Sequence, residues 1–494
     1  MPRSLGRASL VLLGSTWTHG ALSLLTSVMI ARVLDPSAVG TLALNLGLAG
    51  LAMAALLPGF AQAHLKRLAE GQDAGRCLGT MLLIQGGLTI VLVTAVLLAW
   101  WAGALGAASD HTAVFLAMLG GQVSGRLADV FLKALLAREW IVSHGAVLLG
   151  SRLARLVGTA VILVVAPTVV WVATTFLLEG VLTLVVAPAV LAAAGIRLRP
   201  PTLASLADYW RYARPFLITT PLALVQDSMD RVLVARWAGL SAAGYYHVAR
   251  GLWEALAGAM GPPTLMLFTR LSSLYAERSA ERDRQARTLF FSGLDKVLFV
   301  ATAMAIAFWT LAGPAITRLY GTAFEPATTP LRILVMTALA AALVNPYTLV
   351  LQARDEVDRF VRINLARFVV YMAALALLVG GLVPGVPAGE TGAALARLLL
   401  ILFPAWVWFR WTREVAGIPF YGRATVYLAG FGLAVTAFHV TEALVGAGLA
   451  GDLVAAALAF VVYALWLLRL HPDTRANLVY TLSLVAPRLA RRPS

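Results

Sequence analysis

Long apolar segments recur about every 35 residues along the chain of 494 residues, separated by clusters of charge, proline and glycine. Most of the segments reach the ~20 residues that a helix needs to cross a bilayer. They are rich in Leu, Ala and Val, and they lack the alternation of apolar and polar residues that marks membrane-spanning strands. The pattern predicts an all-α protein that crosses a membrane many times.

The separating clusters predict fourteen spans, and the flanking charges predict their orientation. With the N-terminus inside, the inside segments carry 27 Lys and Arg residues and the outside loops carry three. Since Lys and Arg collect on the cytoplasmic side, both termini are expected there. The predicted spans are residues 9–30, 38–61, 78–101, 112–135, 141–165, 169–193, 216–238, 242–267, 290–312, 328–351, 360–383, 391–409, 424–445 and 453–468.

Three polar stretches lie outside these spans. Residues 196–215, IRLRPPTLASLADYWRYARP, read as a basic connector. Residues 270–288 are expected to form a charged cytoplasmic loop. Residues 471–494 have the pattern of a short amphipathic helix with a basic end, which suits the anionic inner leaflet. The N-terminal MPRSLGRASL has no small-residue cleavage site after it, so the first span is expected to be retained.

Two echoes in the sequence predict an internal duplication. ARVLDPSAVG (31–40) aligns without gaps with ARWAGLSAAG (235–244), and RLARLV (152–157) aligns with NLARFV (364–369). Six spans separate each pair, so two six-helix bundles of one orientation are expected, with a cavity between them. The predicted parts are an N-terminal bundle, 1–199, a C-terminal bundle, 200–414, and two extra helices with a basic tail, 415–494.

Composition narrows the classes of function. Hydrophobic residues make up 60% of the chain and charged residues 13%, which is too apolar for a soluble fold. The net charge of +15 is explained by the Lys and Arg residues in the segments predicted to be cytoplasmic, and the sequence contains no nucleic-acid-binding motif. The single cysteine, Cys77, supports neither a disulfide nor a thiolate metal site. With no phosphate-binding loop, HExxH motif or sizeable soluble domain, the chain is not expected to be an enzyme.

Arginines lie one to several turns inside predicted spans at positions 152, 155, 367 and 397. A charge at the centre of a span costs ~2.5–3.5 kcal/mol on an insertion scale, so such residues need a function or a partner. Arg155 and Arg367 match in the second echo, and we expect them, with Arg152 and Arg397 nearby, to line one cavity and bind an anion. The alternative is that their long side chains reach the headgroups, as expected for Arg362.

Most carboxylates have a basic neighbour at helical spacing, as Glu254 has Arg250, and local ion pairing explains them. Glu179 and Asp230 have none, and both are candidates for coupling to H⁺ or Na⁺. Asp230 lies near the outer end of its span, so exposure to solvent is the alternative. His19 is polar enough to line a cavity, and an interhelical hydrogen bond is its alternative role.

The chain resembles a known transporter family. The resemblance lies in ARVLDPSAVG, in RYARPFLITTPLALVQDSMDRVLVARWAGLSAAGYYHVAR through spans seven and eight, and in LYGTAFEPATTPLRIL entering span ten. Residues 9–414 are thereby similar to the oligosaccharide flippase (polysaccharide transporter) branch of the MATE-like MOP exporter superfamily. The resemblance implies a V-shaped pair of bundles that moves an undecaprenyl-pyrophosphate-linked oligosaccharide across a bacterial inner membrane by alternating access.

The same resemblance implies partners and alternatives. The substrate would be a repeat unit of a lipopolysaccharide O-antigen, a capsule or an exopolysaccharide, with glycosyltransferases and a polymerase acting beside the transporter and no resident cofactor. Guanidinium groups would bind its pyrophosphate through paired donors. The alternatives are a peptidoglycan-precursor flippase, a cation-coupled multidrug exporter and a scaffold for glycan synthesis. The drug-exporting branch carries a carboxylate in its first span, and residues 9–30 contain none.

Overall fold

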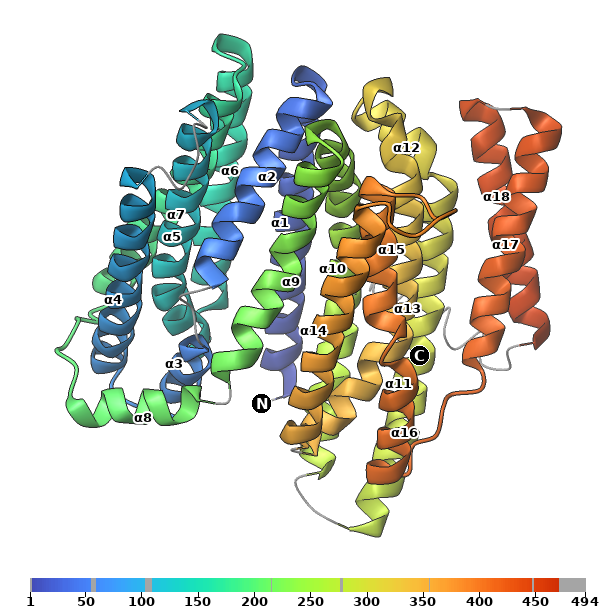
Figure 1. The fold of residues 1–494 in the computed structure, drawn as a ribbon. Coiled ribbons are helices and arrows are strands. Elements are labelled where there is room, and N and C mark those ends of the chain that lie inside the picture. The colour runs from blue at the N-terminus through green and yellow to red at the C-terminus, as the bar shows by residue number, and fades with distance from the viewer. Residues whose placement is uncertain are drawn as a thin grey trace. The chain divides into compact units, whose positions relative to one another are not determined.

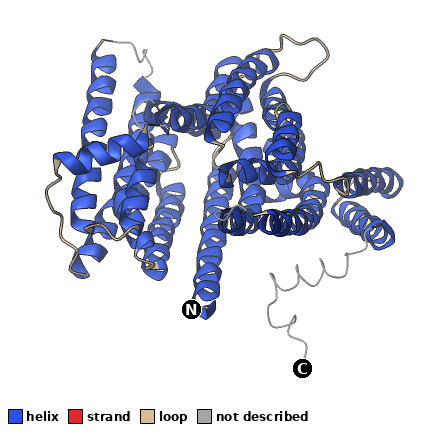
Figure 2. Ribbon diagram, turned by 90° about the horizontal axis from the view of Figure 1, so that it is seen from below, coloured by secondary structure: helices blue, strands red, loops and turns tan. Residues whose placement is uncertain are grey.

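The computed structural model describes residues 2–54, 59–102, 109–214, 216–275, 279–354, 356–446 and 448–470. Within these residues helices are the only regular secondary structure, as Figure 2 shows, so the predicted all-α fold is confirmed. The helices, labelled in Figure 1, are α1 Pro2–Val33, α2 Pro36–Ala54, α3 Phe60–Ala69, α4 Ala74–Trp101, α5 Ser109–Ala137, α6 Ile141–Val165, α7 Val169–Ala193, α8 Leu203–Ala213, α9 Phe216–Trp237, α10 Leu240–Tyr275, α11 Ala280–Thr310, α12 Ala312–Leu319, the 3₁₀ helix η1 Thr322–Ala327, α13 Thr328–Ala353, α14 Val357–Val379, α15 Gly389–Leu402, α16 Ala405–Ala416, α17 Ala424–Val445 and α18 Leu449–Leu470.

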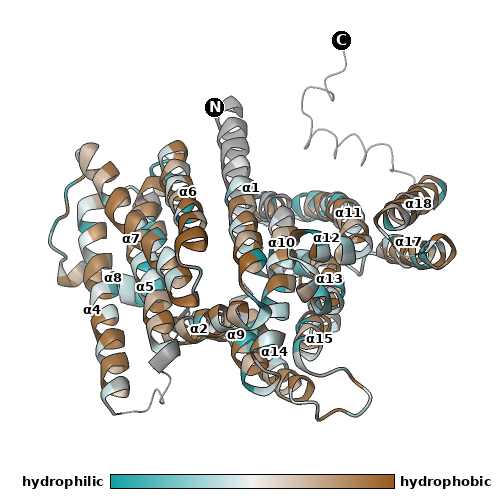
Figure 3. Ribbon diagram, turned by 90° about the horizontal axis from the view of Figure 1, so that it is seen from above, coloured by the Kyte–Doolittle hydropathy of each residue, from teal (hydrophilic) through white to brown (hydrophobic). Residues whose placement is uncertain are grey.

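Hydropathy placed the long helices well. Every predicted span overlaps a helix, and α6 and α7 match the prediction at both ends. Eleven helical stretches of the described residues are long and apolar enough to cross a membrane, and Figure 3 shows hydrophobic residues along most of α4, α7 and α18. The total of fourteen spans stays a prediction, since α9, with Asp227, Asp230 and Arg231 close together, is not among the eleven.

The prediction of a loop at residues 270–288 is wrong, because most of these residues are helical. α10 continues to Tyr275, and Ser279 begins α11 by accepting a hydrogen bond from the backbone N–H of Arg282, with an N···O distance of 3.2 Å. Two carboxylates in the first turn of α11 favour the positive end of the helix dipole. A hydropathy pattern predicts a loop for a charged stretch, but here the Ser279 cap and the acidic first turn favour a helix.

The span predicted at residues 391–409 lies within Gly389–Ala416, a stretch long and apolar enough to cross a membrane, but this stretch is divided into two helices. α15 ends at Leu402 and α16 begins at Ala405, directly after Pro404. Proline has no backbone N–H and cannot continue the hydrogen bonds of the preceding helix, although it is tolerated where a helix starts. The amphipathic helix predicted at 471–494 lies outside the described residues.

The chain forms two compact units, Met1–His247 and Val248–Ser494, and the boundary along the chain falls within α10. In the first unit α5 packs against α7, α2 against α9 and α1 against α6. In the second unit α13 packs against α11 and α15, and the paired helices α17 and α18 pack against α11. The first unit thus brings together α1, α6 and α7, which carry four of the candidate site residues.

Two glycines that align in the first sequence echo touch each other in the first unit. A Cβ added at Gly40 of α2 would lie 1.7 Å from the carbonyl oxygen of Leu240, and one at Gly244 of α10 would lie 2.1 Å from that of Pro36. The contact is reciprocal, as expected for segments related by a twofold axis. No side chain fits there, so the close approach of α2 and α10 requires glycine on both sides.

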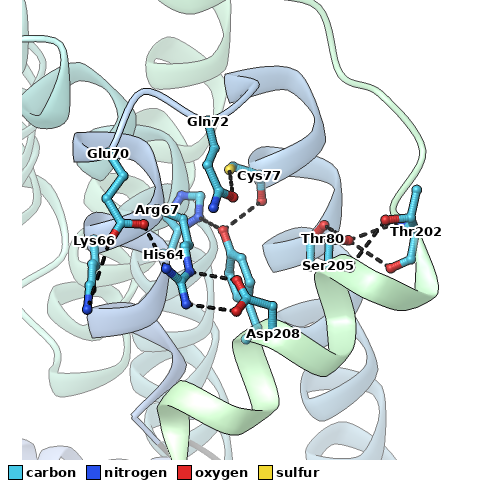
Figure 4. Close-up of polar contacts among 11 residues, drawn as sticks. His64, Lys66, Arg67, Glu70, Gln72, Cys77, Thr80, Thr202, Ser205 and Asp208 are labelled. Carbon is cyan, nitrogen blue, oxygen red and sulfur yellow. Dashed lines mark hydrogen bonds and ion pairs between the residues drawn. The ribbon is translucent and has the colours of Figure 1, made fainter.

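The connector between the predicted bundles contains a docked helix. α8 lies across the ends of α3 and α4, and Figure 4 shows the polar contacts that hold it. The buried hydroxyl of Tyr209 lies 3.0 Å from Nδ1 of His64, and Nε2 of His64 lies 3.0 Å from the carbonyl oxygen of Val130. Because a carbonyl only accepts, Nε2 carries the proton and Nδ1 accepts from Tyr209. Nη2 of Arg67 also donates to Asp208 at 2.8 Å.

This contact predicts a pH-dependent docking of α8. Burial lowers the pKa of His64 from 6.5 to about 4. The folded protein therefore binds this proton more weakly than the unfolded chain, so the stabilisation is complete above pH 6.5 and is lost as the pH falls toward 4. The loss amounts to about 2 kcal/mol at pH 5. We expect α8 amides, corrected for intrinsic rates, to lose hydrogen-exchange protection between pH 7 and pH 5.

The control is His64→Gln, whose amide group can still donate to Val130 and accept from Tyr209 but does not titrate. Its protection of α8 should stay flat over the same range. If wild type and variant showed the same pH profile, His64 would not be the titrating group.

Candidate functional site

Arg152 and Arg155 lie three residues apart on one face of α6, and both contact Glu179 of α7. Nε of Arg152 lies 2.9 Å from Oε1 of Glu179, and Nη1 of Arg155 donates to Oε2 at 3.0 Å. One carboxylate therefore bridges two guanidinium groups. The sequence showed no partner for Glu179 on its own helix, and the structure places both partners on the neighbouring one.

The cluster is partly enclosed and Arg155 is held in place. The side chains of Arg155, Arg152 and Glu179 are 11%, 21% and 20% exposed. The guanidinium carbon of Arg155 lies 3.4 Å from the ring centroid of Phe176, a cation–π contact that contributes ~0.5–2 kcal/mol. Nε of Arg155 is buried and makes no hydrogen bond within the described residues. The phenyl ring and the carboxylate thus orient the guanidinium and leave one of its donors unused.

Two guanidinium groups and one carboxylate give the cluster a net charge of +1. Arginine does not lose its proton in proteins, so this surplus persists at any working pH. In surroundings of low dielectric constant it attracts an anion, and the forked donors match the oxygens of a phosphate. The arrangement suits binding of an anionic group, while Glu179 steadies the two arginines when no anion is bound.

His19 belongs to the same cluster. It lies on α1, which packs against α6, and the charges of Arg152, Glu179 and Arg155 all act on its imidazole. Nδ1 of His19 is buried and makes no hydrogen bond within the described part of the chain. The interhelical hydrogen bond considered from the sequence is thus not made by this atom, which remains available to a ligand.

The other two candidate arginines lie in the second unit. Nη1 of Arg367, on α14, donates to Oδ1 of Asn364 at 3.2 Å, and its Nε is buried without a hydrogen bond among the described residues. Arg397, on α15, is 7% exposed, with its guanidinium carbon 5.2 Å from the ring centroid of Trp253. Arg367 contacts an uncharged amide where Arg155 contacts a carboxylate, so that contact leaves its charge uncompensated.

Asp230 is fully buried, with 0% exposure, so the solvent-exposed position considered from the sequence is not what the structure shows. Tyr246 of α10 donates its hydroxyl to Oδ2 of Asp230 at 2.8 Å, and the backbone N–H of Arg231 donates to Oδ1 at 2.8 Å. Both oxygens are therefore engaged in the first unit. Arg250 pairs with Glu254 at 2.7 Å, as the spacing predicted.

Sequence reasoning missed the aromatic residues that contact these charges, namely Phe176, Trp253 and Tyr246. Aromatic residues are common in membrane spans, so their presence marks no site. The sequence carries one signal for Phe176, which precedes Glu179 by three residues and shares its helix face. All three aromatic residues lie on a different helix from the charge that they contact, and no spacing along the chain reveals such a pair.

A family model described as polysaccharide biosynthesis protein matches residues 5–274 of this chain. The chain belongs to the polysaccharide biosynthesis protein family. The match covers the cluster of Arg152, Arg155, Glu179 and His19, so the candidate site lies in the part of the chain that defines this family. A search of curated proteins found no match.

Several solved structures similar to this chain are transporters and flippases. They include the lipid II flippase MurJ in an inward closed conformation, with a TM-score of 0.72, 12% identity and coverage of 94% of this chain and 99% of that chain. An inward-facing multidrug resistance MATE family transporter has a TM-score of 0.64, 15% identity and coverage of 83% and 98%. A MOP superfamily transporter from Pyrococcus furiosus has a TM-score of 0.55, 16% identity and coverage of 83% and 95%.

These comparisons confirm the MATE-like fold that the resemblance in the sequence implied. At such identities they establish the fold, a multi-pass membrane fold shared by MATE and MurJ proteins. Within the described residues no group of three His, Cys, Asp or Glu side chains is placed to hold a metal ion.

Proposed function

We propose that this protein moves an undecaprenyl-pyrophosphate-linked oligosaccharide from the cytoplasmic to the periplasmic leaflet of a bacterial inner membrane by alternating access. The observation that carries the proposal is the cluster of Arg152, Arg155 and Glu179, with its net charge of +1 inside a membrane fold. A pyrophosphate cannot cross hydrocarbon bare, and a forked, permanently charged donor compensates its charge.

Each residue of the cluster has a role in this proposal. Arg155 and Arg152 bind pyrophosphate oxygens, Glu179 holds the two guanidinium groups between cycles, and the free Nδ1 of His19 contacts the head group. Arg367 and Arg397 contribute further positive charge from the C-terminal bundle. We propose the same bundle bounds as the sequence predicted, namely 1–199 for the N-terminal bundle, 200–414 for the C-terminal bundle and 415–494 for the extra helices and tail. The lipid tail stays in the bilayer, so the protein carries only the head group.

Reconstitution tests the proposal. Purified protein in liposomes should move a fluorescent lipid-linked oligosaccharide to the opposite leaflet, where an added glycosidase that cannot enter the vesicle cleaves it. A rate equal to that of protein-free liposomes would refute the function. O-antigen, capsule or exopolysaccharide pathways, and contacts with a polymerase or glycosyltransferases, are proposals that depend on this first result.

A second candidate, flipping of a peptidoglycan precursor, is supported by the likeness to a lipid II flippase over 94% of this chain. The two functions separate by competition. If unlabelled lipid II blocked transport at lower concentration than the unlabelled lipid-linked oligosaccharide, the second candidate would replace the first. Export of cationic compounds is disfavoured because a cluster of net positive charge repels them.

We propose that both termini are cytoplasmic, on the basis of the charge count along the chain. A cysteine at position 279, before α11, should label only from the cytoplasmic side, and one at the exposed position 388, just before α15, only from the periplasmic side. The background for both is Cys77→Ser, which removes the single native cysteine. Labelling of Ala388→Cys from the cytoplasm alone would mean that the orientation is the reverse of the one proposed.

Asp230 is proposed to bind a coupling H⁺ or Na⁺, since it is a buried carboxylate in a predicted membrane span. Asp230→Asn keeps the shape and removes the charge, so we expect transport to lose its dependence on pH or sodium. Tyr246→Phe, which removes only the donated hydrogen bond, is the control and should keep that dependence. If transport by Asp230→Asn kept the same dependence on pH and sodium, Asp230 would not be the ion-binding residue and its role would be structural.

A further inference from the structure

A groove of about 870 Å³ lies in the second unit, beside α16 and the segment that follows it. Three aromatic side chains and a proline line it, together with Arg410, Arg413 and Glu414. Its volume is within the ~300–1,000 Å³ range of small-molecule sites. The aromatic rings belong to Trp406, Phe409 and Phe420, and Trp406 is 66% exposed. The groove therefore offers an apolar floor next to basic groups.

The aromatic wall of the groove is held by the core of the unit. The ring of Phe409 lies 5.0 Å from that of Phe420 and 4.7 Å from that of Tyr347 on α13, as centroid distances. The hydroxyl of Tyr347 accepts a hydrogen bond from the backbone N–H of Tyr421 at 2.9 Å. Nη1 of Arg354 donates to the carbonyl oxygen of Val415 at 2.6 Å, which ties the last turn of α16 to the end of α13. A wall fixed in this way loses little entropy when a ligand binds.

The charges of the groove favour an anion. Nε of Arg410 donates to Glu414 at 2.8 Å, and its guanidinium carbon lies 5.5 Å from the ring centroid of Trp406. Arg413 is exposed and has no ion pair among the described residues. Two arginines and one carboxylate leave a net charge of +1, and Arg413 is the group that carries it.

We propose that this groove binds the phosphate end of an isoprenoid lipid, with the chain on Trp406, Phe409 and Phe420 and the phosphate on Arg413. The inference rests on the proposed function and deepens it, because it names a docking site for the lipid carrier on the face predicted to be cytoplasmic. The ligand combines an apolar chain with an anionic end, as the groove combines aromatic rings with a guanidinium group. An isoprenoid chain has a double bond in every unit, so it has fewer rotatable bonds per chain carbon than a saturated acyl chain and loses less entropy for each carbon held on a rigid wall.

The test measures lipid binding by the full-length protein in nanodiscs, with undecaprenyl phosphate and phosphatidylglycerol as separate probes. Arg413→Ala should weaken binding of undecaprenyl phosphate about fivefold to tenfold, because it removes a charge-assisted contact with the phosphate that is partly exposed to solvent. Trp406→Ala should weaken it to a similar extent through the chain. Arg284→Ala is the matched control, because Arg284 is an exposed arginine on the same predicted side, at the start of α11 and outside the groove.

The outcomes separate the ligand sources. Loss of undecaprenyl phosphate binding in both groove variants, with phosphatidylglycerol binding and the Arg284→Ala control unchanged, supports the proposal. Equal loss for the two lipids would make the groove a general phospholipid site and overturn the isoprenoid assignment. Unchanged binding in both groove variants would also overturn it.

Failure of the groove and failure of the proposed function can be told apart, because binding is measured without transport. If the protein bound undecaprenyl phosphate normally but moved no lipid-linked oligosaccharide, the proposed function would be refuted and the lipid-binding groove would still be supported. If transport were normal and Arg413→Ala bound the lipid as wild type does, the lipid-binding groove would be refuted and the proposed function would still be supported.

Discussion

Replacing Arg155 with alanine is expected to reduce transport of the lipid-linked oligosaccharide about tenfold to hundredfold. A hydrogen bond to a charged group contributes ~1.5–3 kcal/mol, and that free energy corresponds to this range of affinity. Arg155 combines the deepest burial in its cluster with an unused buried donor, so its loss should weaken capture of the head group most. Arg155→Lys keeps the charge without the fork and should fall between wild type and alanine.

Transport in liposomes and complementation of a flippase-deficient strain both measure this effect, at protein levels shown to be equal in the membrane fraction. Arg138→Ala is the matched control, since it removes one exposed arginine of the same unit, outside the predicted spans and away from Glu179. Unimpaired glycan export by an Arg155→Ala, Arg367→Ala double variant would remove both arginines from the mechanism.

The second large effect is expected on stability, at the contact between α2 and α10. Gly40→Ala would place its Cβ 1.7 Å from the carbonyl oxygen of Leu240, a backbone atom that moves only if a helix moves. Overpacking of this kind destabilises by about 1–3 kcal/mol, and more where backbone must shift. We expect a lower midpoint of thermal unfolding, measured by fluorescence-detected size exclusion, and the same for Gly244→Ala.

Gly251→Ala is the matched control for the second variant, because Gly251 lies on the same helix and a Cβ added there meets nothing within 4 Å. Alanine also favours the helix over glycine, so this control should be neutral or slightly stabilised. Equal thermal stability of Gly40→Ala and wild type would mean that α2 and α10 do not approach as closely as described.

The sequence predicted the long helices because a membrane span has one dominant requirement, a run of apolar residues about as long as the bilayer is thick. α6 and α7 therefore match their predicted ends. The hydropathy pattern did not predict helix boundaries where a local signal competes with it. Ser279 caps a helix within a charged stretch, and Pro404 divides an apolar stretch into α15 and α16. That division also creates α16, beside which the basic aromatic groove lies.

For the site, the sequence by itself determined which charges need a partner, since burying Arg155 or Glu179 in a membrane is costly wherever the chain places it. It also identified Gly40 and Gly244 as equivalent through their matching segments. Only the tertiary structure decided that Arg152 and Arg155 share Glu179, that Phe176 lies against Arg155, and that the two glycines touch. The reason is physical: spacing along one helix shows which side chains share its face, whereas contacts between helices depend on how their side chains pack.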